Sequence, residues 1–364
     1  MAIVASCSTN KLQYPEAPAD NTVDDYFGVQ VADPYRPLEN DTSAATLKWV
    51  EEERALTESY LSKIPFRKDI RERLKTLYDY KKPGMPSKKD GWYYFYENDG
   101  LQNQSVLYRT RSLDDKPEVF LDPNKLSDDG TVALTGISTS NDGKYTAYTI
   151  SRSGSDWTEI YVMDTETKEL LPDHIEWAKF TDAAWQGDGF YYSAYDKPVD
   201  GKEFSHANEN HRVYYHKIGT PQSDDKLVYE DKDHPLHFHS ASVPDDESAL
   251  IIYGGGEGLG SSITMKSLKD PNAKWVTVEP SQDYDISILD IIDGTMYIYT
   301  NYGAPRYRLM TASVKAPQRE NWKELVPEGE GVLSGVNFAG DKLILTYDID
   351  ASNRLYVCLL YTSP

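Results

Sequence analysis

Six copies of one short pattern recur along most of this chain and constrain its fold more than any other feature. Each copy is a tight turn, usually Asp-Gly, then a run rich in Tyr, Val, Ile and Leu, a loop and a second such run. Asp-Gly supplies the positive φ angles that tight turns need, so each copy marks a chain reversal. The turns stand 46 to 57 residues apart, at Asp90-Gly91, Asp142-Gly143, Asp188-Gly189, Asp245-Asp246, Asp293-Gly294 and Gly340-Asp341.

The runs in each copy are strands by residue type, because β-branched and aromatic residues dominate them. The first runs begin at Trp92, Tyr145, Phe190, Ala249, Met296 and Leu343. Repeats of this length that contain several strands are typical of a β-propeller, in which each repeat is one blade. A β-solenoid usually has shorter and stricter repeats, and a large sandwich gives no reason for six similar units. We therefore predict a mainly β protein with about six propeller blades.

The composition of the 364-residue chain limits its partners. Its 59 acidic and 38 basic residues give a net charge of −21. Nucleic acids and anionic lipids are bound through Lys and Arg, so neither is expected as a partner. The two cysteines, Cys7 and Cys358, form neither a disulfide framework nor a zinc motif. No apolar run approaches the length of a membrane-spanning helix.

The residues before the first repeat follow another pattern. In residues 1–10, Val4-Ala5-Ser6-Cys7 resembles the lipidation site of a bacterial lipoprotein, although the apolar stretch before Cys7 is short for a signal peptide. We expect either the remnant of a signal segment, lipidated at Cys7, or a disordered end. Residues 11–80 combine a Pro-rich extended stretch with two helices, one capped by Ser43 and running to about Ser62 and one from Asp69 to Tyr80.

The propeller is predicted over residues 81–360. We place the second strand of the last blade near Leu360, which leaves no room for the rest of that blade. Residues 361–364 are interpreted as a truncated or artefactual tail.

Several motifs spread over about 200 residues carry a resemblance to a known family. They are Asp25-Tyr26-Phe27-Gly28, Asp33-Pro34-Tyr35-Arg36-Pro37-Leu38-Glu39-Asn40, Gly100-Leu101-Gln102-Asn103-Gln104, Phe120-Leu121-Asp122-Pro123-Asn124, Leu126-Ser127-Asp128-Asp129-Gly130, Ser153-Gly154-Ser155-Asp156-Trp157 and Val213-Tyr214-Tyr215-His216. Their content and order closely resemble the N-terminal part of prolyl oligopeptidases, which are serine peptidases. The sequence departs at Pro37, where the family usually has Trp.

The resemblance implies three parts: an N-terminal helical segment that packs on a hydrolase domain, a seven-bladed propeller and a C-terminal α/β-hydrolase domain. This chain supplies the first part and about six blades. It contains no Gly-x-Ser-x-Gly elbow, so the family's catalytic residues have no counterparts in it. We predict that the chain alone is inactive.

Two residues are carried over as candidate substrate-binding residues. Phe180 matches a propeller residue that lines the substrate cavity in the family, whereas core packing beside Trp185 would explain it equally well. Glu257 aligns loosely with another cavity-facing position, within Gly254–Gly260. That glycine-rich run lacks the spacing of a dinucleotide fingerprint and precedes a strand, so we interpret it as a hairpin loop.

The histidines were considered as metal ligands. They fall into two groups, His206, His211 and His216 and then His234, His237 and His239. A spacing of five residues does not make ligands converge on one point, so we predict neither a metal nor an organic cofactor.

The resemblance implies that the whole protein is a serine endopeptidase that cleaves short peptides after proline. Its partners would be short proline-containing peptides and its own hydrolase domain, with the propeller limiting access by size. We expect a monomer located in the bacterial periplasm or anchored as a lipoprotein, the alternative being the cytoplasm. A free-standing propeller that binds without catalysis is the alternative function.

Overall fold

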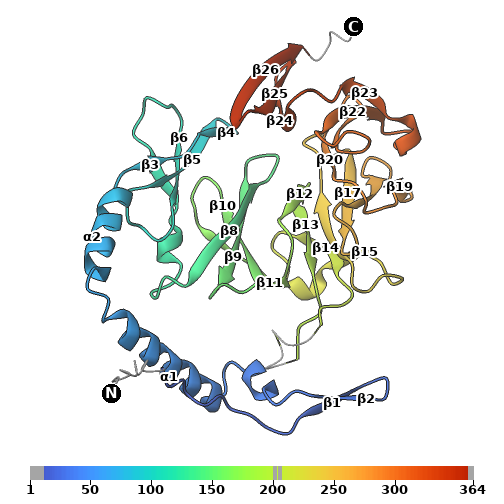
Figure 1. Cartoon of the computed structure of the whole chain (residues 1–364). Coiled ribbons are helices and arrows are strands. Elements are labelled where there is room, and N and C mark those ends of the chain that lie inside the picture. The colour runs from blue at the N-terminus through green and yellow to red at the C-terminus, as the bar shows by residue number, and fades with distance from the viewer. Residues whose placement is uncertain (1–11, 200–202, 204–206, 360–364) are drawn as a thin grey trace, which may run out of the picture. The chain divides into compact units, whose positions relative to one another are not determined.

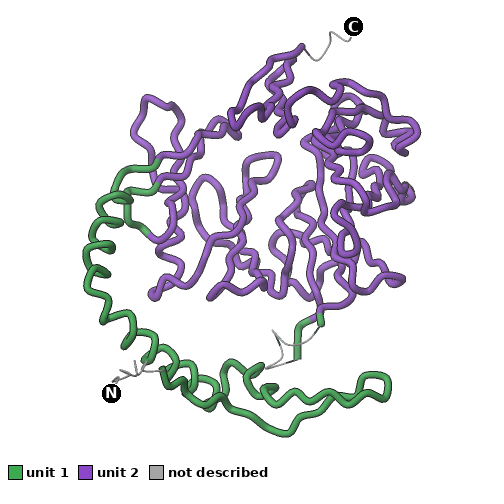
Figure 2. The backbone as a smooth tube through the Cα atoms, in the orientation of Figure 1, with its two compact units in different colours: residues 1–82, 98–102, 197–207 green, residues 83–97, 103–196, 208–364 purple. Residues whose placement is uncertain are grey.

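The computed structural model describes residues 12–199, 203 and 207–359. The chain divides into two compact units (Figure 2). Unit 1 contains residues 1–82, 98–102 and 197–207, and unit 2 contains the rest. Cys7, the predicted lipidation site, and the tail 361–364 lie outside the described residues. Across the described part of the chain, no helix is both long and apolar enough to cross a membrane.

Unit 1 contains the two predicted helices. In α1 (Ala44–Leu61), the Ser43 side chain accepts a hydrogen bond from the Thr46 backbone N–H, so the predicted N-cap is confirmed. α2 (Arg67–Tyr78) begins two residues before the predicted start. Asp69 lies within its first turn, where a carboxylate complements the helix dipole, and does not cap it.

The prediction of a merely extended segment before α1 was incomplete. A hairpin forms there from β1 (Val23–Tyr26) and β2 (Val29–Ala32). Its two turn residues, Phe27 and Gly28, have φ angles of 56° and 90°, as a two-residue hairpin turn requires. A short 3-10 helix, η1 (Arg36–Glu39), follows with Pro37 near its start, where the fixed φ of proline is tolerated.

Unit 2 is a series of antiparallel sheets that follow one another along the chain (Figure 1). Blade 1 contains β3 (Lys82–Pro83), β4 (Ser87–Lys89), β5 (Trp92–Asn98), β6 (Val106–Thr110) and β7 (Glu118–Leu121). Blade 2 contains β8 (Val132–Thr139), β9 (Tyr145–Arg152), β10 (Thr158–Asp164) and β11 (Leu170–Ala178). Blade 3 contains β12 (Ala184–Gln186), β13 (Gly189–Ala194), β14 (Arg212–Lys217) and β15 (Lys226–Glu230).

The remaining blades repeat this order. Blade 4 contains β16 (Phe238–Ser242), β17 (Ala249–Gly255), β18 (Ser262–Ser267) and β19 (Val276–Glu279). Blade 5 contains β20 (Ile286–Ile292), β21 (Thr295–Thr300), β22 (Arg308–Ser313) and β23 (Lys323–Val326). Blade 6 contains β24 (Val332–Ala339), β25 (Lys342–Ile349) and β26 (Ser352–Leu359). The 3-10 helices η2 (Pro123–Lys125), η3 (Gln222–Asp224) and η4 (Arg319–Asn321) lie in connections.

The two strands predicted in each copy are the second and third strands of a blade. Each copy also has a strand before the turn, which the pattern did not include. For this reason the last sheet has three strands within the described residues, and β26 is its third strand instead of its second.

Strand direction sorts the connections of unit 2 into two ends. Within a blade each strand is antiparallel to the next. The turns between first and second strands, which include Asp142-Gly143 and Asp293-Gly294, therefore lie at one end of the blades, which we call the turn end. The connections between second and third strands and those between blades lie at the opposite end, the loop end, which includes residues 153–157, 179–183, 231–237 and 256–261.

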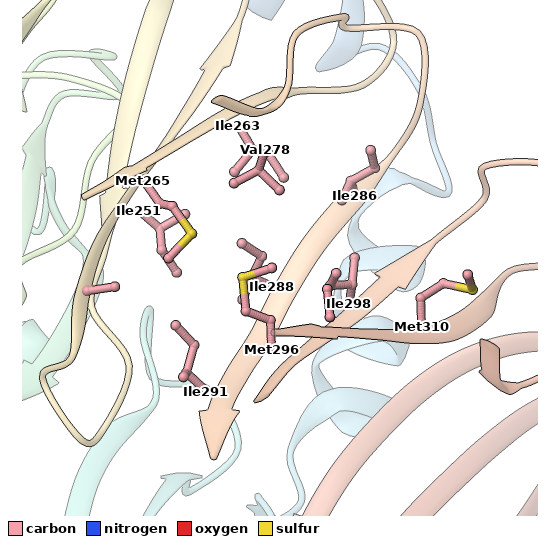
Figure 3. Packing of buried hydrophobic residues seen from close by; sticks show 12 residues of the cluster. Ile251, Ile263, Met265, Val278, Ile286, Ile288, Ile291, Met296, Ile298 and Met310 are labelled. Atoms are coloured by element: carbon pink, nitrogen blue, oxygen red, sulfur yellow. The ribbon is translucent and has the colours of Figure 1, made fainter. Parts of the chain in front are cut away.

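Apolar side chains fill the space between neighbouring blades. Figure 3 shows the cluster between blades 4 and 5, where Ile251, Ile263 and Met265 face Ile288, Met296 and Ile298. Similar clusters join blades 1 and 2, 2 and 3, 3 and 4, and 5 and 6. A fully buried residue of this kind contributes about 1.5–3 kcal/mol. The predicted propeller is confirmed, because each sheet buries its faces only against its neighbours.

His216, one of the histidines considered as a metal ligand, instead links blades 2 and 3. Its side chain is fully buried between two carboxylates, with Nε2 3.0 Å from Oδ1 of Asp173 and Nδ1 2.7 Å from Oδ1 of Asp225. The Tyr192 hydroxyl donates to the other oxygen of Asp225. Burial opposes charge on the imidazole, but the hydrogen bonds and charges of Asp225 and Asp173 outweigh it and raise the pKa of His216.

Candidate functional site

A hollow of about 520 Å³ opens near the loop end of unit 2. Its wall comes from blades 2 and 4 and from the connection between blades 2 and 3, and it consists mainly of hydroxyl, carboxylate and aromatic side chains. The lining residues are Thr135, Ser151, Ser155, Asp156, Thr158, Phe180, Thr181, Asp182, Ser240, Ala241, Ser242 and Tyr253. Such a surface can hydrogen-bond a peptide backbone and receive an apolar side chain at an aromatic ring.

Phe180 lies in the wall of this hollow. Its side chain is 51% exposed and contacts the rings of Phe238 and His211, at centroid distances of 5.3 and 6.3 Å. The alternative of core packing beside Trp185 is wrong, because Trp185 is buried against Tyr145 and Phe190. Phe180 also has a φ of 52°, a backbone conformation that non-glycine residues rarely adopt outside functional or strongly constrained sites.

The side chain of Lys179 lies behind Phe180 and supports its ring. The Nζ atom of Lys179, a buried residue, lies 4.8 Å from the ring centre of Trp157 and 5.4 Å from that of Phe180. The same nitrogen is 3.8 Å from the carboxylate of Asp156 on the hollow wall. The ammonium group therefore lies close to the Asp156 carboxylate while it supports two aromatic rings.

His211 is fixed as a neutral ring. Its Nδ1 accepts a hydrogen bond from the His239 backbone N–H (2.8 Å), so its proton is on Nε2, which donates to the Lys179 carbonyl (3.0 Å). Burial, together with the nearby His239, lowers the pKa of His211 to about 3. The ring thus acts as a structural support for the loop that carries Phe180.

Asp182 is the second carboxylate of the wall. It is accessible to solvent, yet the surrounding protein partly desolvates its carboxylate and raises its pKa. Within the described residues we find no hydrogen-bond or ion-pair partner for this carboxylate. It packs against Gly136, where a Cβ atom would lie only 2.3 Å from Oδ1 of Asp182. Of the two carboxylates in the wall, Asp182 is therefore the one without an ion-pair partner among the described residues.

Glu257 lies in the loop after β17. It contacts His237, and the next residue, Phe238, contacts Phe180. One carboxylate oxygen of Glu257 is 3.2 Å from Nε2 of His237, the residue before Phe238. Its backbone N–H donates to Oε1 of Gln282 (2.8 Å). The predicted hairpin loop begins later than expected, because Gly254 and Gly255 still belong to β17. Gly260 is required for close packing, since a Cβ there would lie 1.7 Å from the Tyr284 carbonyl oxygen.

The sequence did not point to several residues of this site. Lys179, Asp182 and Phe238 carry no motif, and Phe238 is separated from Phe180 by an entire blade. The histidines do not form the groups that their spacing indicates: His211 stacks with His239, His234 stacks with His237, and His216 lies apart. His206 lies outside the described residues. A Lys-Phe pair between two strands, at 179–180, is the one local signal that could have drawn attention.

A propeller with a polar hollow near its loop end defines the class of protein, and comparison with known proteins defines the family. The family model for the N-terminal β-propeller domain of prolyl oligopeptidase matches residues 14–363. The chain belongs to this family.

Individual relatives agree with this assignment. The chain is 38% identical over 355 residues to a prolyl endopeptidase of Elizabethkingia miricola, covering 97% of this chain and 50% of the relative. It is 33% identical to prolyl oligopeptidase A of Amanita bisporigera, covering 98% and 52%. A solved structure of prolyl oligopeptidase B from Galerina marginata, bound to a 25mer macrocyclization substrate, has a TM-score of 0.82 at 28% identity, covering 96% and 53%. The chain thus spans about half the length of the relatives it matches.

Proposed function

We propose that this chain is the N-terminal and propeller part of a serine endopeptidase that cleaves short peptides after proline. Membership in the prolyl oligopeptidase propeller family carries the proposal. The nucleophilic Ser, the His that acts as its general base and the Asp that orients the His would belong to an α/β-hydrolase domain of the whole protein. In that protein the residues described here would bind and select peptides.

The hollow supports a role in substrate selection. The ring of Phe180 offers an apolar face to a proline ring or a neighbouring side chain, and the hydroxyls of Ser240 and Ser242 can hydrogen-bond a peptide backbone. A hollow of this size, framed by blades 2 and 4 and the connection after β11, has room for a short unstructured segment only. The propeller would therefore filter peptides by size more than by sequence.

The exposed helices of unit 1 support a partner domain. Ile70, Leu74 and Leu77 recur on one face of α2, and each is about half exposed. Leu47 and Val50 of α1 are exposed to a similar degree. Apolar rows of this kind usually mark an interaction surface, and the hydrolase domain of the whole protein is the partner we propose.

The test is to recover the full coding sequence from the source DNA and express the whole protein. It would be assayed on a fluorogenic Gly-Pro peptide, with a Gly-Ala peptide as the matched control, in the presence and absence of a serine-directed phosphonate. We expect cleavage of the Gly-Pro peptide that the phosphonate abolishes. A reading frame without a hydrolase domain, or a whole protein with no such activity, would reject the peptidase and favour a binding propeller.

Position in the cell and oligomeric state are part of the same proposal. We propose a monomer directed to the periplasm or anchored through Cys7. Mass spectrometry of the protein isolated from its source would detect a lipid on Cys7, and size-exclusion chromatography would give the oligomeric state.

A further inference from the structure

A compact group of metal-ligating side chains lies at the loop end beside the hollow. Asp231, His234 and His237 belong to the connection between β15 and β16, and they bring one ligand atom each within 4.8 Å of one another. We propose that these three residues, with Glu257, bind one divalent transition-metal ion, Zn²⁺ by the chemistry of the ligands. The sequence predicted no metal here, because the spacing of the histidines does not reveal the approach of Glu257 from another loop.

The separations suit a tetrahedral ion. Zinc–ligand bonds of about 2.0–2.1 Å place two ligands of a tetrahedral site about 3.3 Å apart. Nε2 of His237 lies 3.2 Å from Oε1 of Glu257, and Nδ1 of His234 lies 3.0 Å from Oδ2 of Asp231. The two imidazoles stack at a centroid distance of 4.5 Å with their planes 7° apart, so one ring must turn before both can direct a nitrogen lone pair at the same ion, and the Glu257 carboxylate must move towards the other three ligands.

A buried nitrogen without a hydrogen bond distinguishes this group from ordinary His–carboxylate pairs. His237 is only 8% exposed, and its Nε2 atom has no hydrogen-bond partner in the described part of the chain, although Glu257 is close. An unsatisfied buried polar atom costs folding free energy. A metal ion bound to Nε2 would remove this cost.

The ligand types select among ions. Two imidazoles with two carboxylates favour Zn²⁺ and its transition-metal neighbours, whereas Mg²⁺ and Ca²⁺ prefer oxygen ligands only. The carboxylates of Asp231 and Glu257 would balance the charge of a divalent ion. Asp231 also accepts the backbone N–H groups of Asp233 and His234, which holds the loop in a tight turn before any ion binds.

Binding at Nδ1 of His234 requires that the proton which it shares with Asp231 move to Nε2 of the same ring. Binding at Nε2 of His237 requires a second local rearrangement. The Gln282 amide nitrogen faces Nδ1 of His237 at 3.4 Å, at the outer limit of a hydrogen bond. When Nε2 binds the ion, the proton of the ring moves to Nδ1, and the Gln282 amide must rotate so that its oxygen accepts this proton. The backbone N–H groups of Glu257 and Gly258, which both donate to this oxygen, then lose their acceptor, and this allows the Glu257 loop to move towards the ion.

An ion at this site would join two loops at the loop end. It would fix the Asp231–His237 loop, which directly precedes Phe238, to the loop that carries Glu257. Because Phe238 packs on Phe180, the ion would stiffen one wall of the hollow.

The test is calorimetric titration of the EDTA-treated 364-residue chain with ZnCl₂, followed by the absorption spectrum of the Co²⁺ form. We expect one Zn²⁺ per chain and Co²⁺ bands of tetrahedral intensity. His234→Ala and Glu257→Gln change exposed side chains and should each weaken Zn²⁺ binding by more than about tenfold, since even indirect changes near a metal cost that much. Far-UV circular dichroism would verify that both variants remain folded.

His174→Ala is the matched control. His174 forms a similar pair with Glu159, at 2.9 Å, but no second histidine of the described residues lies beside it, so its loss should leave Zn²⁺ affinity unchanged. The proposal is overturned if the unmodified chain shows no saturable Zn²⁺ binding. It is equally overturned if His234→Ala binds as tightly as the unmodified chain, or if His174→Ala weakens binding to the same degree.

Discussion

Asn141 and Glu247 are 106 residues apart in sequence, and a hydrogen bond of 3.0 Å joins their side chains at the turn end of the propeller. The second oxygen of the Glu247 carboxylate accepts the backbone N–H of Gly187, also at 3.0 Å. One carboxylate therefore connects the turns of blades 2, 3 and 4. Glu247 has a φ of 49°, so the backbone is held in an unfavourable conformation to deliver this side chain.

Replacing Glu247 should weaken the contact between these three blades. Glu247→Ala removes both acceptors, and we expect the free energy of unfolding to fall by about 1–3 kcal/mol. Urea denaturation of the chain measures the change. Glu320→Ala, on the exposed surface of η4, is the control and should change stability by less than about 0.5 kcal/mol. Equal losses for both variants would contradict the connecting role of Glu247.

His216 should make stability depend on pH. Its pKa is raised in the folded protein, so its ionic contribution is fully present below the pKa of an unfolded histidine and is lost as the pH rises through the raised value. His216→Gln leaves Asp173 and Asp225 buried without their cation, and should cost about 3–5 kcal/mol on the acidic side.

Urea denaturation of both proteins over a pH series would check this. The difference between them should shrink at alkaline pH. His174→Gln removes a partly exposed pair and should cost less than about 1 kcal/mol. A cost for His216→Gln that stays constant with pH would show that packing, and not charge, explains the effect.

Phe180 should affect peptide binding more than folding. Its φ of 52° suits glycine and its ring is half exposed, so Phe180→Gly should leave the free energy of unfolding nearly unchanged. In the whole enzyme we expect KM for a short proline peptide to rise on the order of tenfold, with kcat less affected. Phe27→Gly is a matched control, because Phe27 is also exposed and has a φ of 56°. Equal KM values for Phe180→Gly and the parent enzyme would remove Phe180 from the site.

Asp182 should favour cationic peptides. Two unit charges about 4 Å apart in water attract by ~1 kcal/mol, so Asp182→Asn should reduce the preference for a Lys-containing over a Glu-containing peptide on the order of fivefold in kcat/KM. Asp156→Asn is the matched control and should have a smaller effect, because the Lys179 ammonium group, 3.8 Å away, partly offsets the charge of Asp156. An unchanged preference in Asp182→Asn would exclude the charge from substrate selection.

Asp182→Asn should also change the stability of the protein, and here the loss of the charge should be favourable. Desolvation raises the pKa of Asp182, so the charged carboxylate disfavours the folded state once the pH rises through that value. Asp182→Asn should then be at least as stable as the parent at neutral pH, and the difference should vanish in acid. Thermal unfolding across this pH range measures it.

Local elements were predicted well, because their determinants lie close together in the chain. Asp142-Gly143 and the run from Tyr145 were sufficient to predict a turn followed by a strand, and β9 forms there. Ser43 was sufficient to predict the start of α1. The second helix and the segment before α1 were predicted less well, since an Asp can either cap a helix or lie in its first turn, and proline can either prevent a helix or begin a short one.

The site could be predicted only in part. Resemblance to the family indicated Phe180 as a lining residue, and the structure places its side chain in the hollow. Its neighbours could not be predicted. Phe238 belongs to blade 4, whereas Phe180 follows the last strand of blade 2. Asp182 fits only because Gly136 of blade 2 leaves room for its carboxylate.

By itself, the sequence determined two strands of each blade, their turns and the cap of α1, because each depends on residue types within a few positions of one another. The propeller followed from the repetition of these elements along the chain. The tertiary structure decided which polar groups meet, as in His216 with Asp173, Glu247 with Asn141 and His237 with Glu257. The physical reason is that blades bury their faces only against each other. The stacking of neighbouring blades therefore sets which distant side chains share the same dry or confined space.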